Sequence, residues 1–152
     1  MISVEMNPNI IRNIRKVEPY VPGEQPQNRV VKLNTNENPY PPAPGVERVL
    51  AEMDTDRFRL YPDPSAAKLV SVLAEHHHVG EDQVFVGVGS DDVLAMCFLT
   101  FFNSEKPVLF PDITYSFYKV WAELYRIPYE CPKLDGDFRI VKEDYYKENG
   151  GV

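Results

Sequence analysis

With 152 residues, the chain has the length of a single domain and can bury a sizeable core. Its composition, 43% hydrophobic and 26% charged residues, is typical of a soluble globular protein. The formal net charge of −7 argues against nucleic acid or an anionic membrane as the main partner. No apolar run approaches the length of a membrane span, and the N-terminus does not resemble a signal peptide, so the sequence predicts a cytoplasmic protein.

The first part of the chain predicts short elements joined by proline-rich connections. Asn7 followed by Pro8, with isoleucines at helical spacing, predicts a short amphipathic helix within residues 7–18. A linker containing Tyr20 leads to a predicted short strand at 30–33 and a proline-stiffened turn at 35–42. Residues 45–53 and 65–78 predict two further helices, the second with Ser65 as its N-cap.

The stretch from 83 to 102 combines a strand, a glycine turn and an apolar helix. The valine-rich run 84–88 predicts a strand covered on both faces. Gly87 and Gly89 free the backbone to turn, and Ser90 is the predicted N-cap of a helix that runs to Phe102. Asp91 and Asp92 would stand in the first turn, where the helix dipole favours negative charge.

Further strands and helices alternate downstream. Residues 106–111 and 127–131 predict two strands, residues 115–125 a helix between them, and residues 141–146 one more short helix. The last residues, 149–152, predict the beginning of another strand. This order indicates an α/β fold with a parallel sheet, in which ligands bind beyond the carboxyl ends of the strands, and Ser90 and Tyr115 both lie just past such ends.

A helix that starts after a glycine turn can bind phosphate, because its first amides have no partner within the helix. An ordinary strand-to-helix corner is the alternative interpretation, since the spacing matches neither the dinucleotide-binding fingerprint nor the P-loop. The two aspartates also weaken the electrostatic case. Cys97 and Cys131 are predicted to be reduced, buried small hydrophobes, and no metal site is predicted.

Several short motifs, taken together and in order, resemble the histidinol-phosphate aminotransferases, which are class I/II aminotransferases among the fold-type I pyridoxal-phosphate enzymes. The motifs are Tyr20 in EPYVPG, Asn36 to Tyr40 (NENPY), Tyr61 to Asp63 (YPD), Gly89 to Asp92 (GSDD), and the segment FPDITYSFY with Tyr115. The resemblance implies the first part of a fold-type I large domain, a three-layer structure with a mostly parallel sheet. It divides the chain into an N-terminal arm with part of the small domain, residues 1–56, and half of the cofactor-binding large domain, residues 57–152.

The resemblance also implies roles for individual residues toward pyridoxal 5′-phosphate. Gly89, Ser90, Asp91 and Asp92 would hold its phosphate through backbone amides. Tyr115 would stack on the pyridine ring, and Tyr61 would reach the cofactor phosphate of a neighbouring subunit, which implies a homodimer with a shared active site. For both tyrosines, core or interface packing is the alternative.

Two more residues would line the substrate side. Tyr20 and Asn36 have this role by resemblance, with a packed linker tyrosine and an Asx turn before Pro39 as the alternatives.

The sequence departs from the family pattern in one respect that matters for chemistry. The Schiff-base lysine, the aspartate that pairs with the pyridine nitrogen and the arginine that binds the substrate carboxylate cannot be placed in this chain. The resemblance therefore implies a truncated N-terminal portion, inactive by itself, of an enzyme that transfers an amino group between histidinol phosphate and 2-oxoglutarate. A threonine-phosphate decarboxylase-like enzyme and a non-catalytic phosphate-binding or dimerisation module are the alternatives.

Overall fold

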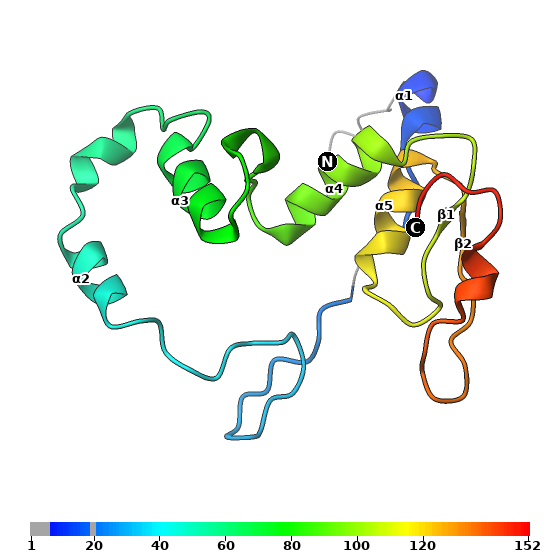
Figure 1. The fold of residues 1–152 in the computed structure, drawn as a ribbon, viewed down its shortest axis with the longest axis horizontal. Helices are drawn as coiled ribbons and strands as arrows, with labels where there is room; N and C mark the ends of the chain where they lie inside the picture. Colours follow the sequence, from blue (N-terminus) through cyan, green and yellow to red (C-terminus); the bar gives the residue numbers. More distant parts are fainter. Residues whose placement is uncertain (1–6, 19–20) are drawn as a thin grey trace, which may run out of the picture. The chain divides into compact units, whose positions relative to one another are not determined.

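The computed structural model describes residues 7–18 and 21–152, which form two compact units (Figure 1). The first unit contains the described residues up to Glu18 together with Gly87–Val152, and the second contains Val21–Val86. None of the helices in these ranges is long and apolar enough to cross a membrane. Each unit is described by itself below.

The second unit consists of short helices and extended connections. Its elements are α2 (Gly45–Ala51), the 3₁₀ helix η1 (Thr55–Arg59), α3 (Ala67–His77) and the 3₁₀ helix η2 (Glu81–Gln83). The predictions of helices within 45–53 and 65–78 are thus confirmed. The predicted strand at 30–33 is wrong, because this segment pairs with no strand among the described residues and Val31 and Leu33 are exposed. Ala74 is the one buried residue among those described in this unit.

The first unit begins with α1 (Pro8–Asn13), which confirms the predicted helix after Asn7 and Pro8. The Asn7 side chain caps it by accepting a hydrogen bond from the Asn9 amide at 2.9 Å. Further along, Arg15 Nε donates to the carbonyl of Leu124 at 3.1 Å. That contact ties the segment after α1 to a helix more than one hundred residues later in the sequence.

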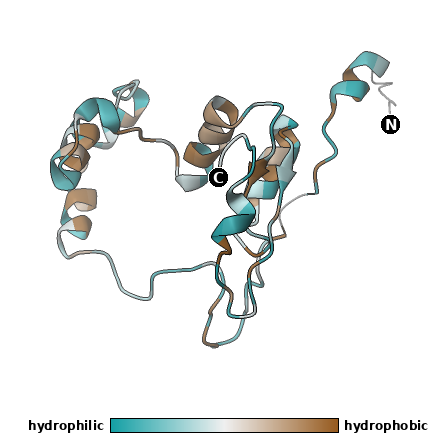
Figure 2. Cartoon of the chain, turned by 45° about the vertical axis from the view of Figure 1, so that its right-hand side comes forward, coloured by the Kyte–Doolittle hydropathy of each residue, from teal (hydrophilic) through white to brown (hydrophobic). Residues whose placement is uncertain are grey.

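The helix predicted from residue 90 is present as α4 (Ser90–Phe101), but the strand predicted before it, at 84–88, is wrong. Figure 2 shows most of α4 as hydrophobic. Before it, Phe85 and Val88 are 67% and 92% exposed, and the segment lies in no sheet. A strand is held by hydrogen bonds to neighbouring strands, and the described residues supply none here.

The predicted βαβ unit is confirmed in the second half of the first unit. Strand β1 (Val108–Leu109) leads through α5 (Phe117–Tyr125) to β2 (Tyr129–Glu130), and the two strands pair in parallel, with Val108 opposite Tyr129 (Figure 1). The Val108 amide donates to the carbonyl of Pro128 at 2.9 Å. The connection contains a helix, as a parallel crossover requires.

On its other side β1 is joined by the end of the chain. A parallel bridge links Val108 to Gly151, and the Leu109 amide donates to the Gly151 carbonyl at 2.9 Å. This agrees with the predicted beginning of a strand at 149–152. Gly151 has φ +148°, and an added Cβ would lie 2.3 Å from the ring of Phe102, so only glycine fits.

The core of the first unit surrounds β1. Its buried members come from α4, β1, α5 and the turn before β2, and they are Phe98, Val108, Phe110, Ala122 and Ile127. Five half-buried aromatic side chains pack against it: Phe102, Tyr118, Trp121, Tyr125 and Tyr129. The Tyr129 hydroxyl donates to Glu123 at 3.0 Å, and burial together with this carboxylate raises the pKa of Tyr129 to about 12. The contact fastens β2 to α5.

The expectation for the cysteines is only partly met. Cys97 and Cys131 are both free thiols, but Cys97 is half-buried and Cys131 is exposed. Cys131 is the residue directly after β2. The prediction of two buried cysteines is therefore wrong, because β2 lies at the edge of the sheet that the described residues form.

Leu109 offers a test of the importance of β1, since its side chain is completely buried. We expect Leu109→Ala to lower the free energy of unfolding by about 2–5 kcal/mol through lost burial and the cavity left behind. The matched control, Leu33→Ala, removes the same atoms from an 88% exposed side chain and should cost less than about 0.5 kcal/mol. Urea denaturation followed by fluorescence of Trp121 measures both, and equal effects of the two variants would contradict this account of the core.

Candidate functional site

The turn Gly89–Asp92 at the start of α4 has a backbone suited to binding an anion. Gly89 is the N-cap, with φ +85° and ψ 168°, and no side chain caps the helix. The prediction that Ser90 is the N-cap is wrong, because the left-handed conformation falls on Gly89 and Ser90 already belongs to the helix. The Val93 amide makes the first helical bond, to the Gly89 carbonyl at 3.3 Å. The amides of residues 90–92 therefore precede the helical hydrogen-bond ladder.

The carboxylate of Asp92 turns back toward the residues before the helix. Its Oδ2 accepts a hydrogen bond from the Val88 amide at 3.1 Å. The approach is close, since a Cβ at Gly87 would lie 2.8 Å from the same oxygen. This hydrogen bond between the Asp92 side chain and the Val88 backbone stabilises the turn. It also directs the carboxylate toward the residues before the helix.

The carboxylate of Asp91 contacts the other predicted site residue of this unit. The Tyr115 hydroxyl donates to Asp91 Oδ1 at 2.6 Å, which joins the start of α4 to the loop after β1. The Tyr115 ring stacks on Phe117, with centroids 5.6 Å apart, and meets Tyr118 edge-on at 5.9 Å. The Tyr115 residue is 44% exposed to solvent. The structure thus brings together Asp91 and Tyr115, which are 24 residues apart in sequence.

Of the remaining predicted residues, Asn36 and Tyr61 lie in the second unit, and Tyr20 lies outside the described residues. Asn36 is exposed and has φ +51°, next to Thr35 at φ +63°. The Asx turn considered for Asn36 is made instead by Asn38, whose Oδ1 accepts from the Tyr40 amide at 3.0 Å. The two successive left-handed residues leave the Asn36 side chain in solvent.

Tyr61 is fully exposed, so packing in a core of its own unit does not account for it. It lines an open pocket of ≈ 810 Å³ together with residues of α2, η1 and the connections after them. Asp63, two residues after Tyr61, accepts hydrogen bonds from the Ser65 hydroxyl at 2.7 Å and from the amide of Ala67, the first residue of α3, at 2.7 Å. The N-cap of α3 is Ala66, with φ +48° and no side-chain cap bond, so the prediction that Ser65 is the N-cap is wrong, and Asp63 supplies the oxygen that accepts from the first helical amide.

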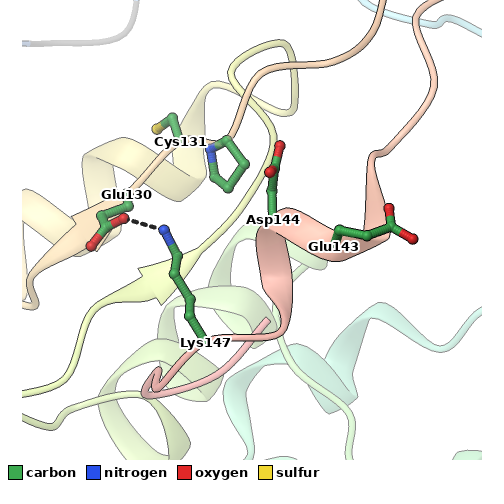
Figure 3. Close-up of a pocket in the computed structure, with 6 residues that line it drawn as sticks. Glu130, Cys131, Glu143, Asp144 and Lys147 are labelled. Carbon is green, nitrogen blue, oxygen red and sulfur yellow. Dashed lines mark hydrogen bonds and ion pairs between the residues drawn. The ribbon is translucent and has the colours of Figure 1, made fainter.

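A pocket that the sequence did not indicate lies just beyond the carboxyl end of β2 (Figure 3). Its volume is ≈ 400 Å³, and it is lined by Glu130, Cys131, Pro132, Glu143, Asp144 and Lys147. Lys147 is paired with Glu130, so the two remaining carboxylates make the pocket acidic and unsuited to a phosphate group. In the part of the chain that is described, no cluster of histidine, cysteine and carboxylate side chains is arranged to hold a metal.

These observations define an α/β chain with a phosphate-compatible helix start next to an exposed aromatic ring. The family model of class I and II aminotransferases matches residues 28–146. The chain therefore belongs to the class I and II aminotransferase family, and the resemblance seen in its motifs is confirmed.

The similarity to individual curated proteins is high but covers part of their length. The chain is 54% identical over 139 residues to the histidinol-phosphate aminotransferase of Chromohalobacter salexigens, covering 91% of the chain and 40% of that protein. It is 52% identical over 141 residues to the protein of the same name from Lactococcus lactis subsp. cremoris, with 92% and 40% covered. For Clostridium beijerinckii the identity is 50% over 140 residues, with 91% and 39% covered. The chain thus spans about 40% of the length of these relatives.

The cap of α3 predicts a local dependence on pH. Hydrogen bonds from the Ser65 hydroxyl, the Ala67 amide and the Ser65 amide lower the pKa of Asp63 below its usual value. Because the folded pKa is depressed, the cap is at full strength above the pKa of the unfolded chain, 3.8, and is lost as the pH falls through the lower folded value.

We therefore expect the first turn of α3 to stay helical at neutral pH and to lose helical structure in acid. Carbon chemical shifts of Lys68 and Leu69, followed from neutral pH downward, measure the helix directly. Asp63→Asn keeps one of the two accepting oxygens, which can still face the Ala67 amide, and it cannot titrate, so its first turn should show no such transition. Parallel transitions in the wild type and in Asp63→Asn would assign the effect to another group.

Proposed function

We propose that this chain is the N-terminal, phosphate-binding part of a pyridoxal-phosphate-dependent aminotransferase that acts on histidinol phosphate and 2-oxoglutarate. Membership of the class I and II aminotransferases supports the reaction type, and the names of relatives at 50–54% identity, histidinol-phosphate aminotransferases, support the substrate. The relatives described above are histidinol-phosphate aminotransferases by name, which favours this substrate over threonine phosphate. The observation that carries the proposal is the hydrogen bond from Tyr115 to Asp91, because it connects a partly exposed aromatic residue to the first turn of α4.

The residues of the first unit fit the phosphate and ring of pyridoxal phosphate. The amides of Ser90, Asp91 and Asp92 stand at a helix N-terminus, where the dipole adds positive potential. Among the described residues, none beyond the two chain neighbours of Gly89 lies within 4 Å of the position that a Cβ would take there, which leaves space beside the turn. The Tyr115 ring offers a flat apolar face for the cofactor ring.

When bound, pyridoxal phosphate supplies the electron sink for amino-group transfer. In our proposal the chain's own residues bind and orient it: the turn Gly89–Asp92 fixes the phosphate, and Tyr115 sets the plane of the ring. Asn36 and Tyr20 line the substrate side. The lysine that binds the cofactor covalently, and the arginine that binds the substrate carboxylate, belong to the part of the enzyme that this chain does not span.

The exposed apolar surface supports a larger assembly around this chain. In the second unit Val31, Leu33, Phe58 and Tyr61 are all more than two-thirds exposed. Surfaces of this kind are normally covered by other protein. We propose that Tyr61 reaches the cofactor phosphate of a second subunit in a cytoplasmic homodimer, and that residues 57–152 form half of the large domain, with its three layers completed by the rest of the enzyme.

The amides at the start of α4 can be tested one at a time. Proline is accepted at the first helical position, where its missing N–H breaks no helical bond, so Ser90→Pro removes one proposed phosphate donor and leaves α4 intact. We expect it to weaken binding of pyridoxine 5′-phosphate by about threefold to tenfold, the loss of one hydrogen bond of about 0.5–1.5 kcal/mol. Pyridoxine 5′-phosphate has no aldehyde and cannot attach to surface lysines.

The control for that variant is Ser90→Ala, which keeps the amide and loses only the hydroxyl. Its affinity should match that of the wild type if the backbone makes the contact. Amide chemical-shift changes of residues 89–93 during the titration locate the ligand. Changes confined to other residues, or equal binding by Ser90→Pro and the wild type, would contradict the proposed phosphate site.

The proposed absence of the covalent lysine gives a separate prediction. Pyridoxal 5′-phosphate added to this chain should produce no saturable lysine-linked absorption band at one equivalent, because no lysine lies in the motif context of the cofactor lysine. Absorption titration followed by borohydride reduction and peptide mass analysis measures this. A single lysine labelled stoichiometrically would overturn the assignment of the catalytic lysine to the remainder of the enzyme.

A further inference from the structure

We propose that Asp91 is a positioning residue, whose carboxylate holds the ring of Tyr115 in place beside the start of α4. The inference rests on the proposed function for its purpose, the alignment of a cofactor ring with its phosphate. It rests on the structure for its geometry, because the Tyr115 hydroxyl and Asp91 Oδ1 are 2.6 Å apart. A hydrogen bond to an ionised acceptor is about twice as strong as one between neutral groups.

Burial alone does not fix the ring of Tyr115. The residue is 44% exposed, and its ring contacts Phe117 and Tyr118. The hydrogen bond to Asp91 adds an attachment point at the start of α4. The hydroxyl is the far end of the ring, so a bond there restrains both side-chain torsions together.

The same contact explains how an aspartate can stand at a helix start that binds an anion. A free carboxylate there would compete with phosphate for the amides of residues 90–92. In the structure the carboxylate of Asp91 accepts a hydrogen bond from the Tyr115 hydroxyl. The carboxylate is therefore directed toward the loop after β1. Asp92 is engaged differently, with the backbone of Val88, and so shapes the turn without touching the ring.

Three variants of the full chain test the positioning directly. Asp91→Asn keeps an oxygen that accepts from the tyrosine hydroxyl, whereas Asp91→Ala removes it. Nuclear Overhauser effects between the Tyr115 ring protons and the amide protons of residues 90 and 91 report where the ring lies. We expect them in the wild type and in Asp91→Asn and expect them to be lost in Asp91→Ala. Glu105→Gln, which removes an exposed charge after the other end of α4, should keep them.

Ligand binding then separates ring alignment from phosphate binding. Asp91→Ala should weaken binding of pyridoxine 5′-phosphate by about threefold to tenfold, the value of one hydrogen bond. Its affinity for inorganic phosphate should be unchanged or higher, since a negative charge has been removed from the helix start. Tyr115→Phe should cause the same loss as Asp91→Ala, and the double variant should lose no more than either, as expected for two groups that act through one contact.

The outcomes distinguish this inference from the proposed function. If Asp91→Ala keeps the ring contacts, or if its effect adds to that of Tyr115→Phe, the positioning role is wrong whether or not the cofactor binds. If the wild type binds neither pyridoxine 5′-phosphate nor inorganic phosphate at residues 89–92, the proposed function fails, while loss of the ring contacts in Asp91→Ala and their retention in Asp91→Asn would still establish the positioning contact. Tyr115→Phe removes only the hydroxyl and leaves Asp91 unchanged, so loss of the ring contacts in this variant as well guards against misfolding of Asp91→Ala as the cause.

Discussion

The pairing of β1 on both of its sides is the constraint on which the first unit depends. β2 lies along one side, Gly151 closes the other, and Leu109 between them has no exposed surface. The strand has only two residues, yet it gathers side chains from α4, α5 and the turn before β2 into one core. Because β1 is fixed by backbone bonds on both sides, the loop that follows it has a fixed origin, and that loop carries Tyr115.

The contrast between β1 and residues 84–88 shows which parts of the fold a sequence can predict. Both segments are short apolar runs, and both were predicted to be strands. The helices were predictable because their hydrogen bonds are local, within four residues along the chain. A strand depends on partners elsewhere, so the same pattern produced a sheet at Val108 and an exposed, unpaired segment at Phe85, where the described chain offers no neighbour.

The candidate site was predictable to a similar extent. Residue types alone predict the glycine turn and the start of α4. The N-cap is the exception, because Gly89, with its positive φ, occupies that position and Ser90 is the first residue of the helix. The contact between Asp91 and Tyr115 could not be read from the sequence, since it joins two elements whose relative placement is set by the core around β1. Both residues were candidates individually. What the structure adds is that they act on each other.

That contact also bears on how an acidic chain can bind an anion. A net charge of −7 offers no general attraction for a phosphate, and two aspartates occupy the first turn of the helix proposed to bind it. Each aspartate, however, accepts a hydrogen bond from a group outside the helix, one from Tyr115 and one from Val88. The amides of the turn are thereby left facing solvent with the helix dipole behind them. In the proposed site, local hydrogen bonding rather than net charge would therefore govern how the two carboxylates face an anion, and the same two bonds connect Tyr115 and the turn before α4 to this helix start.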